Sequence, residues 1–349
     1  MYIILALLLL AILITVHEFG HFLAARATKI DVREFAVGMG PKIVGWKSRK
    51  YETQFSIRAI PLGGFCSFYG EDDTTGESKD DPRAFAKQNV WKRLCVIFAG
   101  PLMNFVLAFI AASIFFWVNG APGVEPYIYN VDADSPAYSA GLQADDVVME
   151  INGENMLDGT YTTLLNTIGA WKEGDAPLKM LVRRGEETFE TEAVPVWDES
   201  SEKMLIGVRV GQKRIPETFL GGFKHSWQLC VNVSGIIIES LKKLVTTGEG
   251  LEDTMGPVGI VSAVSQRVQT YGMEEFIWLL AMLSVNLGLM NLLPIPGLDG
   301  SRLVFGLVEV VRRRPVPAEK EAMVHLIGMV FLFGLMIFFT FRDVMRIFG

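Results

Sequence analysis

Two histidines and a glutamate near the N-terminus form the strongest chemical signal in the chain. His17, Glu18 and His21 occur in the order His-Glu-Phe-Gly-His. Residues four apart on a helix share a face, so both imidazoles can reach one Zn²⁺ while Glu18 faces the attacking water. The chain has only four histidines, so this spacing is improbable by composition alone. The motif predicts a zinc site.

A catalytic zinc usually takes a third protein ligand, and Asp299 is the best candidate. It lies in the stretch 291–300, where two prolines and two glycines end an apolar segment. Backbone exposed in this way is tolerated around a water-containing cavity but not against lipid. His225 and His325 are the alternative ligands, although both are more typical of ordinary interfacial histidines. Asp299 could instead cap the helix that follows it.

Four apolar stretches are long enough to cross a membrane and to position these residues. Half of the 349 residues are hydrophobic, only 20% are charged, and the mean hydropathy is +0.32. A signal peptide is the alternative for the first stretch, but that stretch has no Lys or Arg before its apolar run. The predicted spans are Met1 to about Ala25, Leu94–Val118, Phe276–Leu293 and Met323–Phe341.

Three ionisable side chains, His17, Glu18 and His21, lie in the apolar first span, and their presence there requires an explanation. Such side chains near the middle of a membrane cost a few kcal/mol each, and they are normally paired, metal-bound or beside water. Polar residues reaching out from a helix end are the structural alternative. At about 1.5 Å per residue, His17 lies roughly 24 Å along the helix from Met1, toward the cytoplasmic leaflet.

The density of basic residues predicts the orientation of the spans. Positions 26–93 hold 13 of the 32 Lys and Arg residues, and the short loop 294–322 holds five. The much longer segment 119–275 holds 12. Loops rich in Lys and Arg are cytoplasmic, so the segment 119–275 and both termini are expected on the outer side.

Residues 119–213 are predicted to form a small folded domain, because charges are frequent there and short β-type runs occur. Two such runs are Val147–Ile151 and Leu205–Val210. The segment from Ser135 to Gly153 resembles the PDZ fold of bacterial proteases, with Asp145 where that fold usually has glycine. PDZ domains commonly bind an extended peptide at a sheet edge. A spacer or steric gate with an empty groove is the equal alternative.

The remaining composition excludes several classes of protein. A net charge of −7 and a pI of about 5.3 argue against nucleic-acid binding. Cys66, Cys95 and Cys230 lie far apart and show no C-x-x-C spacing, so they predict neither a disulfide framework nor a cysteine zinc site.

Taken together, these motifs resemble the site-2 protease family, in its bacterial RseP-like branch. The resemblance rests on the His-Glu-Phe-Gly-His motif, the 291–300 motif and the single PDZ insert. Supporting strings stand at 38–41, 61–65 and 99–104. The chain departs from the family pattern at Ser301, where relatives generally have a second glycine, and in carrying one PDZ domain instead of two.

The resemblance implies a role for each motif residue. His17, His21 and Asp299 would hold zinc, and Glu18 would be the general base. A β-loop at about 51–67 would present an extended substrate. Three further residues would help to hold that substrate: Asn291, Pro294 and Pro296.

The predicted fold is therefore a polytopic α-helical membrane protein with four transmembrane helices, a membrane-associated β-loop and a small α/β PDZ-type domain. The predicted domains are 1–118 with the first two spans, 119–213 as the extracytoplasmic PDZ domain, 214–275 with interfacial helices, and 276–349 with the last two spans. Within 214–275, the apolar pieces Leu229–Ile238 and Val258–Val264 are too short to span a membrane.

The predicted function is zinc-dependent intramembrane proteolysis in the bacterial cytoplasmic membrane, with the active site toward the cytoplasm. Partners implied by the resemblance are the lipid bilayer and single-span membrane proteins, such as pre-trimmed anti-sigma factors or remnant signal peptides. The alternatives are a non-catalytic PDZ scaffold and a zinc transporter or sensor. Transport normally requires acidic or histidine ligands spread along several spans, and the spans here offer little beyond the one cluster and Asp299.

Overall fold

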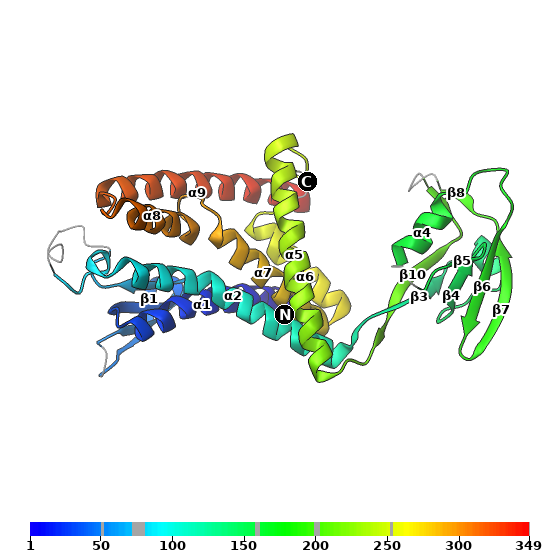
Figure 1. The fold of residues 1–349 in the computed structure, drawn as a ribbon, viewed down its shortest axis with the longest axis horizontal. Helices are drawn as coiled ribbons and strands as arrows, with labels where there is room; N and C mark the ends of the chain where they lie inside the picture. Colours follow the sequence, from blue (N-terminus) through cyan, green and yellow to red (C-terminus); the bar gives the residue numbers. More distant parts are fainter. Residues whose placement is uncertain (50–51, 72–80, 158–160, 199–202, 252–253, 349) are drawn as a thin grey trace. The chain divides into compact units, whose positions relative to one another are not determined.

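The computed structural model describes residues 1–348 except 50–51, 72–80, 158–160, 199–202 and 252–253 (Figure 1). The chain forms two compact units. Unit 1 combines Met1–Phe116 with Leu220–Gly349, and unit 2 is Trp117–Phe219.

Among the described residues of unit 1, four helices are long and apolar enough to cross a membrane. This confirms the four spans predicted from hydropathy, each extended by a few residues at one or both ends. The helices are α1 (Tyr2–Thr28), α2 (Val90–Asn119), α7 (Met273–Leu292) and α9 (Ala318–Phe348).

The two short apolar pieces between the second and third spans belong to longer helices. Leu229–Ile238 lies within α5 (Phe219–Thr247), and Val258–Val264 lies within α6 (Pro257–Tyr271). Neither helix meets the length and composition required of a candidate membrane span. α5 packs on α2, and α6 packs on α1, the span that carries the two predicted histidine ligands. Their place at the membrane interface stays a prediction.

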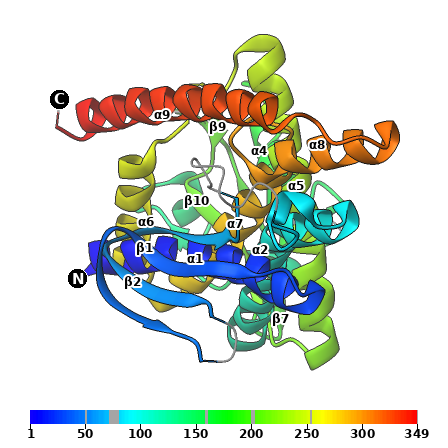
Figure 2. The same ribbon diagram turned by 90° about the vertical axis from the view of Figure 1, so that its left-hand side faces the viewer.

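A β-hairpin follows α1 and lies beside it (Figure 2). It consists of β1 (Val32–Lys47) and β2 (Gln54–Phe68), and a short 3-10 helix, η1 (Phe85–Lys87), follows it. Both strands bend, so residues 34–37 of β1 pair with residues 54–57 on one side and 64–67 on the other. The predicted β-loop at about 51–67 corresponds to β2, except that Tyr51 lies outside the described residues.

The third span is followed by a break in the helix. α7 ends at Leu292, and α8 (Asp299–Arg312) begins after a six-residue turn. Gly297 has φ +98°, a backbone conformation that L side chains rarely adopt. A Cβ at Gly300 would lie only 2.1 Å from the Leu293 carbonyl oxygen, so only glycine fits this close approach. The two glycines let the chain turn sharply at the predicted third ligand.

Unit 2 is a small α/β domain built on a six-stranded sheet. The strand order is β10-β3-β4-β6-β7, and β5 pairs with β4. Two helices, α3 (Pro136–Ser139) and α4 (Tyr161–Gly169), belong to this unit. The sheet strands are β3 (Ala121–Val131), β4 (Val147–Ile151), β5 (Glu154–Asn155), β6 (Leu178–Arg184), β7 (Glu187–Ala193) and β10 (Val208–Ile215).

In unit 2, one strand expected from the sequence differs in the structure, and the backbone at Asp145 explains why PDZ sequences usually have glycine there. The expected strand Leu205–Val210 is wrong as a single element, because β9 (Lys203–Leu205), which pairs with β8 (Val196–Asp198), ends before β10 begins. Gly207 breaks the run with φ +78°, and a Cβ there would lie 2.3 Å from Ser135 Cβ. Asp145 has φ +71°, which is the physical reason for the glycine that PDZ folds usually carry at this position.

Candidate metal centre

Helix α1 places two imidazoles one above the other on its buried face. His17 and His21 are each 7% exposed. Their Nε2 atoms lie 3.2 Å apart, with the ring planes at 87°. The predicted i, i+4 geometry is therefore present, and both Nε2 atoms point to one place.

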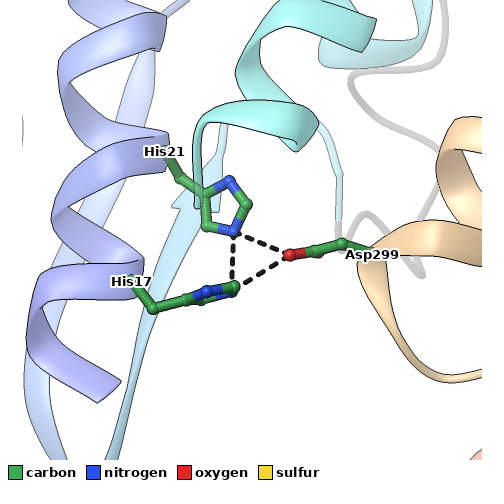
Figure 3. A group of neighbouring side chains, drawn as sticks. All are labelled: His17, His21 and Asp299. Atoms are coloured by element: carbon green, nitrogen blue, oxygen red, sulfur yellow. Dashed lines mark hydrogen bonds and ion pairs between the residues drawn. The ribbon is translucent and has the colours of Figure 1, made fainter. Parts of the chain in front are cut away.

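Asp299 brings a carboxylate to the same place from the start of α8 (Figure 3). Its Oδ2 lies 3.0 Å from His17 Nε2 and 3.2 Å from His21 Nε2. Asp299 is the first residue of α8, whose N-cap is Leu298, with no side-chain capping hydrogen bond. The alternative in which Asp299 acts as a helix cap is therefore wrong.

These three atoms fit a zinc ion by donor type and by spacing. All three ligand atoms lie within 4.8 Å of one another. Zinc bonds to nitrogen and carboxylate oxygen are about 2.0–2.2 Å, which separates tetrahedral ligand atoms by about 3.3–3.5 Å. The distances of 3.0–3.2 Å are close to this spacing. Oδ2 is also buried, and no hydrogen bond from the described part of the chain satisfies it, a deficiency that a cation removes.

Helix α2 supplies the outer contacts of both histidines. His21 Nδ1 lies 2.9 Å from the Val96 carbonyl oxygen, and His17 Nδ1 lies 3.2 Å from Asn104 Nδ2. Ligating histidines generally use the second ring nitrogen in this way, which fixes the orientation of the ring.

Two glycines allow α1 and α2 to approach closely at this level. A Cβ at Gly20 would lie 2.3 Å from the Ala99 carbonyl oxygen. A Cβ at Gly100 would lie 2.3 Å from His21 Nε2, the atom that faces Asp299. Gly100 therefore leaves the space that the His21 ring occupies.

Glu18 lies where two cavities meet. One cavity of about 260 Å³ is lined by Glu18, Asn291 and Leu298, and the other, of about 290 Å³, is lined by Glu18, Cys66 and Glu71. His17 and Asp299 border both cavities. Water and a substrate backbone can thus reach Glu18, His17 and Asp299 from two sides, and His21 from the second cavity.

The second cavity has a charged wall that the sequence patterns did not reveal. Arg302, the residue after the departure at Ser301, pairs with Glu71. Cys66 lines the same cavity, and burial together with the charges of Glu18 and Glu71 raises the pKa of its thiol well above the ordinary range. At neutral pH this group is therefore a neutral thiol beside the site.

The other residues named from the sequence take different places. Asn291 lines the first cavity, but neither Pro294 nor Pro296 lines either cavity. Pro296 packs against α9, where a Cβ at Gly328 would lie 2.2 Å from its carbonyl oxygen. A substrate-holding role for the two prolines stays a prediction.

Neither alternative histidine belongs to the cluster. The ring centroids of His225 and Phe116 lie 5.7 Å apart. The Gly297 backbone N–H donates to His325 Nδ1 at 3.3 Å. His325 thus supports the turn before Asp299 and does not join the ligand atoms.

Comparison with known proteins gives a consistent result. The family model of peptidase family M50 matches residues 5–335. The zinc metalloprotease RasP of Oceanobacillus iheyensis is 31% identical over 423 aligned residues, which cover 98% of each chain. The regulator of sigma-W protease RasP of Bacillus subtilis is 31% identical over 414 aligned residues, which cover 96% of each chain.

Comparison with solved structures finds a match to part of the chain. The PDZ domain of the SdrC-like protein of Listeria monocytogenes matches 26% of this chain and 88% of its own, at 23% identity and a TM-score of 0.22.

Removing a ligand should remove the metal. We expect His17→Ala, His21→Ala and Asp299→Ala each to lose stoichiometric zinc, because two remaining ligands bind it too weakly to survive purification. Zinc per chain, measured by mass spectrometry after dialysis, tests this expectation. His225→Ala removes an imidazole outside the cluster and should keep one zinc. Full zinc occupancy in Asp299→Ala would contradict the carboxylate ligand.

Filling the space beside His21 should disturb the site without changing any polar group. Overpacking costs about 1–3 kcal/mol, so Gly100→Ala should weaken zinc binding by about 5- to 150-fold. Competition with a fluorescent chelator measures this change. Gly235→Ala is the matched control, because a Cβ there meets nothing within 4 Å. Equal zinc affinity of the two variants would show that the close approach at Gly100 is unimportant.

Proposed function

The chain belongs to peptidase family M50, the site-2 proteases, and is a multi-pass membrane zinc metalloprotease; we propose that it cleaves single-span membrane proteins within or beside their transmembrane segments. The observation that carries this proposal is the convergence of His17, His21 and Asp299 beside Glu18, among helices apolar enough to cross a membrane. A substrate that reaches this site from the lipid must itself be apolar.

We assign the zinc ligands to His17, His21 and Asp299. When bound, zinc supplies Lewis acidity, which lowers the pKa of water and stabilises negative charge on a peptide carbonyl oxygen. Glu18 takes a proton from the water whose oxygen attacks the carbonyl carbon. It then gives that proton to the leaving amine nitrogen as the C–N bond breaks.

A helical substrate must unwind before its carbonyl groups can react, and the edge of β2 supports a way to hold the unwound chain. Among the described strands, residues 64–67 pair with β1 on one side alone. Cys66 lines the second cavity together with Glu18, and a Cβ at Gly64 would lie 3.6 Å from Glu18 Cγ. A substrate strand added at this edge would run past the general base. Asn291 offers amide hydrogen bonds from the first cavity.

We place the protein in the bacterial cytoplasmic membrane, with the active site toward the cytoplasm and residues 119–213 outside. The basic loops 26–93 and 294–322 support this orientation. The relative in Bacillus subtilis is named as a regulator of sigma-W. Pre-trimmed anti-sigma factors are therefore a substrate class for this chain, and remnant signal peptides are another. The PDZ-type domain either binds a peptide or excludes large ectodomains.

Replacing the general base should separate metal binding from turnover. We expect Glu18→Gln to keep one zinc per chain and to cleave a labelled single-span substrate about 10²- to 10⁴-fold more slowly, because the amide cannot take the proton. Gel analysis of cleavage in detergent measures the rate. Glu239→Gln, an exposed change on α5, should be fully active.

Full activity of Glu18→Gln would rule out this base. A wild-type protein that binds zinc but leaves every single-span substrate intact, with or without a chelator, would favour the scaffold or the transporter. Co-purification of membrane peptides with Glu18→Gln would identify the substrates.

Orientation is tested separately by labelling single cysteines in intact cells. With Cys66, Cys95 and Cys230 replaced by serine, we expect an impermeant maleimide to label Glu186→Cys in unit 2. Arg313→Cys, in the basic loop, should be labelled only after permeabilisation. The reverse pattern would invert the proposed topology.

A further inference from the structure

Asn104 is a fully buried amide in the middle of α2, a predicted membrane span. Its Nδ2 lies 3.2 Å from His17 Nδ1, and its Oδ1 has no hydrogen-bond partner among the residues that the structure describes. A buried amide with an unsatisfied oxygen costs free energy in an apolar helix bundle, so its presence needs a reason. The residue closes the string 99–104, in which Gly100 already lies against His21.

The orientation of this amide decides which tautomer of His17 it favours. If His17 Nε2 holds a metal through its lone pair, the ring proton sits on Nδ1 and must be donated. An amide nitrogen opposite Nδ1 cannot accept that proton. The oxygen and nitrogen of an asparagine side chain are nearly the same shape, and a half-turn of the amide exchanges them. That half-turn places Oδ1 opposite Nδ1 and gives this unsatisfied acceptor its partner.

We propose that Asn104 is a positioning residue whose Oδ1 accepts the Nδ1 proton of His17 and so holds the Nε2 lone pair toward the metal. This inference rests on the proposed ligand set and deepens it. His21 has the equivalent arrangement with the Val96 carbonyl oxygen, 2.9 Å from its Nδ1. Both imidazoles are thus oriented from α2, one by a backbone carbonyl and the other by a side chain that can be changed.

The surroundings hold Asn104 in place for this role. Ser284 Oγ of α7 donates to the Asn104 backbone carbonyl at 2.8 Å, which ties α2 to the third span. One turn before Asn104, Gly100 lies against His21, so α2 meets both histidines on the same face. The amide is therefore held at the ligand, and among the described residues His17 is its side-chain hydrogen-bond partner.

The test compares two replacements of similar size. Asn104→Leu removes the acceptor, whereas Asn104→Asp keeps an oxygen that can accept from Nδ1. Loss of such an outer partner typically weakens metal binding by about 10- to 100-fold. We expect that loss for Asn104→Leu and a change below about threefold for Asn104→Asp. Chelator competition on the full-length detergent-solubilised protein measures the zinc affinity, and no substrate is needed.

A matched control separates hydrogen bonding at the ligand from hydrogen bonding elsewhere in α2. Ser113→Ala removes a buried hydroxyl that bonds to Ser226 Oγ, away from the histidines, and should leave the affinity unchanged. If Asn104→Leu does not fold, Asn104→Ala removes the same acceptor with less packing strain, and the same loss is expected.

The outcomes distinguish this inference from the zinc assignment beneath it. If the wild type binds no zinc, or if His17→Ala binds as much zinc as the wild type, the ligand set itself is wrong. If the wild type binds zinc and Asn104→Leu binds it equally well, only the role of Asn104 is overturned. An equal loss in Asn104→Asp and Asn104→Leu would also overturn it, because then the acceptor would not be what matters.

Discussion

Three polar atoms that converge inside apolar helices are the constraint on which unit 1 depends. Two imidazole nitrogens and one carboxylate oxygen lie 3.0–3.2 Å apart. Such a cluster would be costly without a cation, because a buried carboxylate oxygen without a hydrogen bond loses the solvation it had in water. The close approach of α1 and α2 at Gly20 and Gly100 sets this geometry. The close packing of α1 and α2 and the geometry of the metal ligands therefore depend on the same two glycines.

The break between α7 and α8 brings the third ligand residue, Asp299, to the two histidines. A continuous helix would carry Asp299 past the site, whereas the turn at Gly297 and Gly300 starts a new helix there. Irregular backbone at membrane depth is tolerated where it is covered by protein or borders water. Here His325 and α9 cover one side of the turn, and a cavity borders the other.

The two cavities show how a water-dependent reaction fits into such a bundle. Both include Glu18, and they differ in their outer walls, with Asn291 in one and the Glu71–Arg302 pair in the other. The edge of β2 borders Glu18, so an extended chain and water can meet at the same carboxylate. A strand edge is a ready template for pairing with a second chain, and here it lies next to the reactive groups.

The sequence alone determined those features that depend on local periodicity. The i, i+4 spacing placed His17 and His21 on one face, hydropathy placed the four spans, and β4 has the predicted bounds. These features follow from helical and strand repeats within a few residues. Asp299 was also identified as the third ligand candidate, because the prolines and glycines around it forecast a break in the helix.

Only the tertiary structure decided which distant groups meet the histidines. Asn104 is 87 positions from His17, and the Val96 carbonyl is 75 positions from His21. Such contacts depend on how one helix is rotated and how closely it approaches another, and no local repeat encodes either quantity. Two other findings depend on such distant contacts. Gly207 interrupts a strand-like run where Ser135 lies against it, and Pro296 packs on α9.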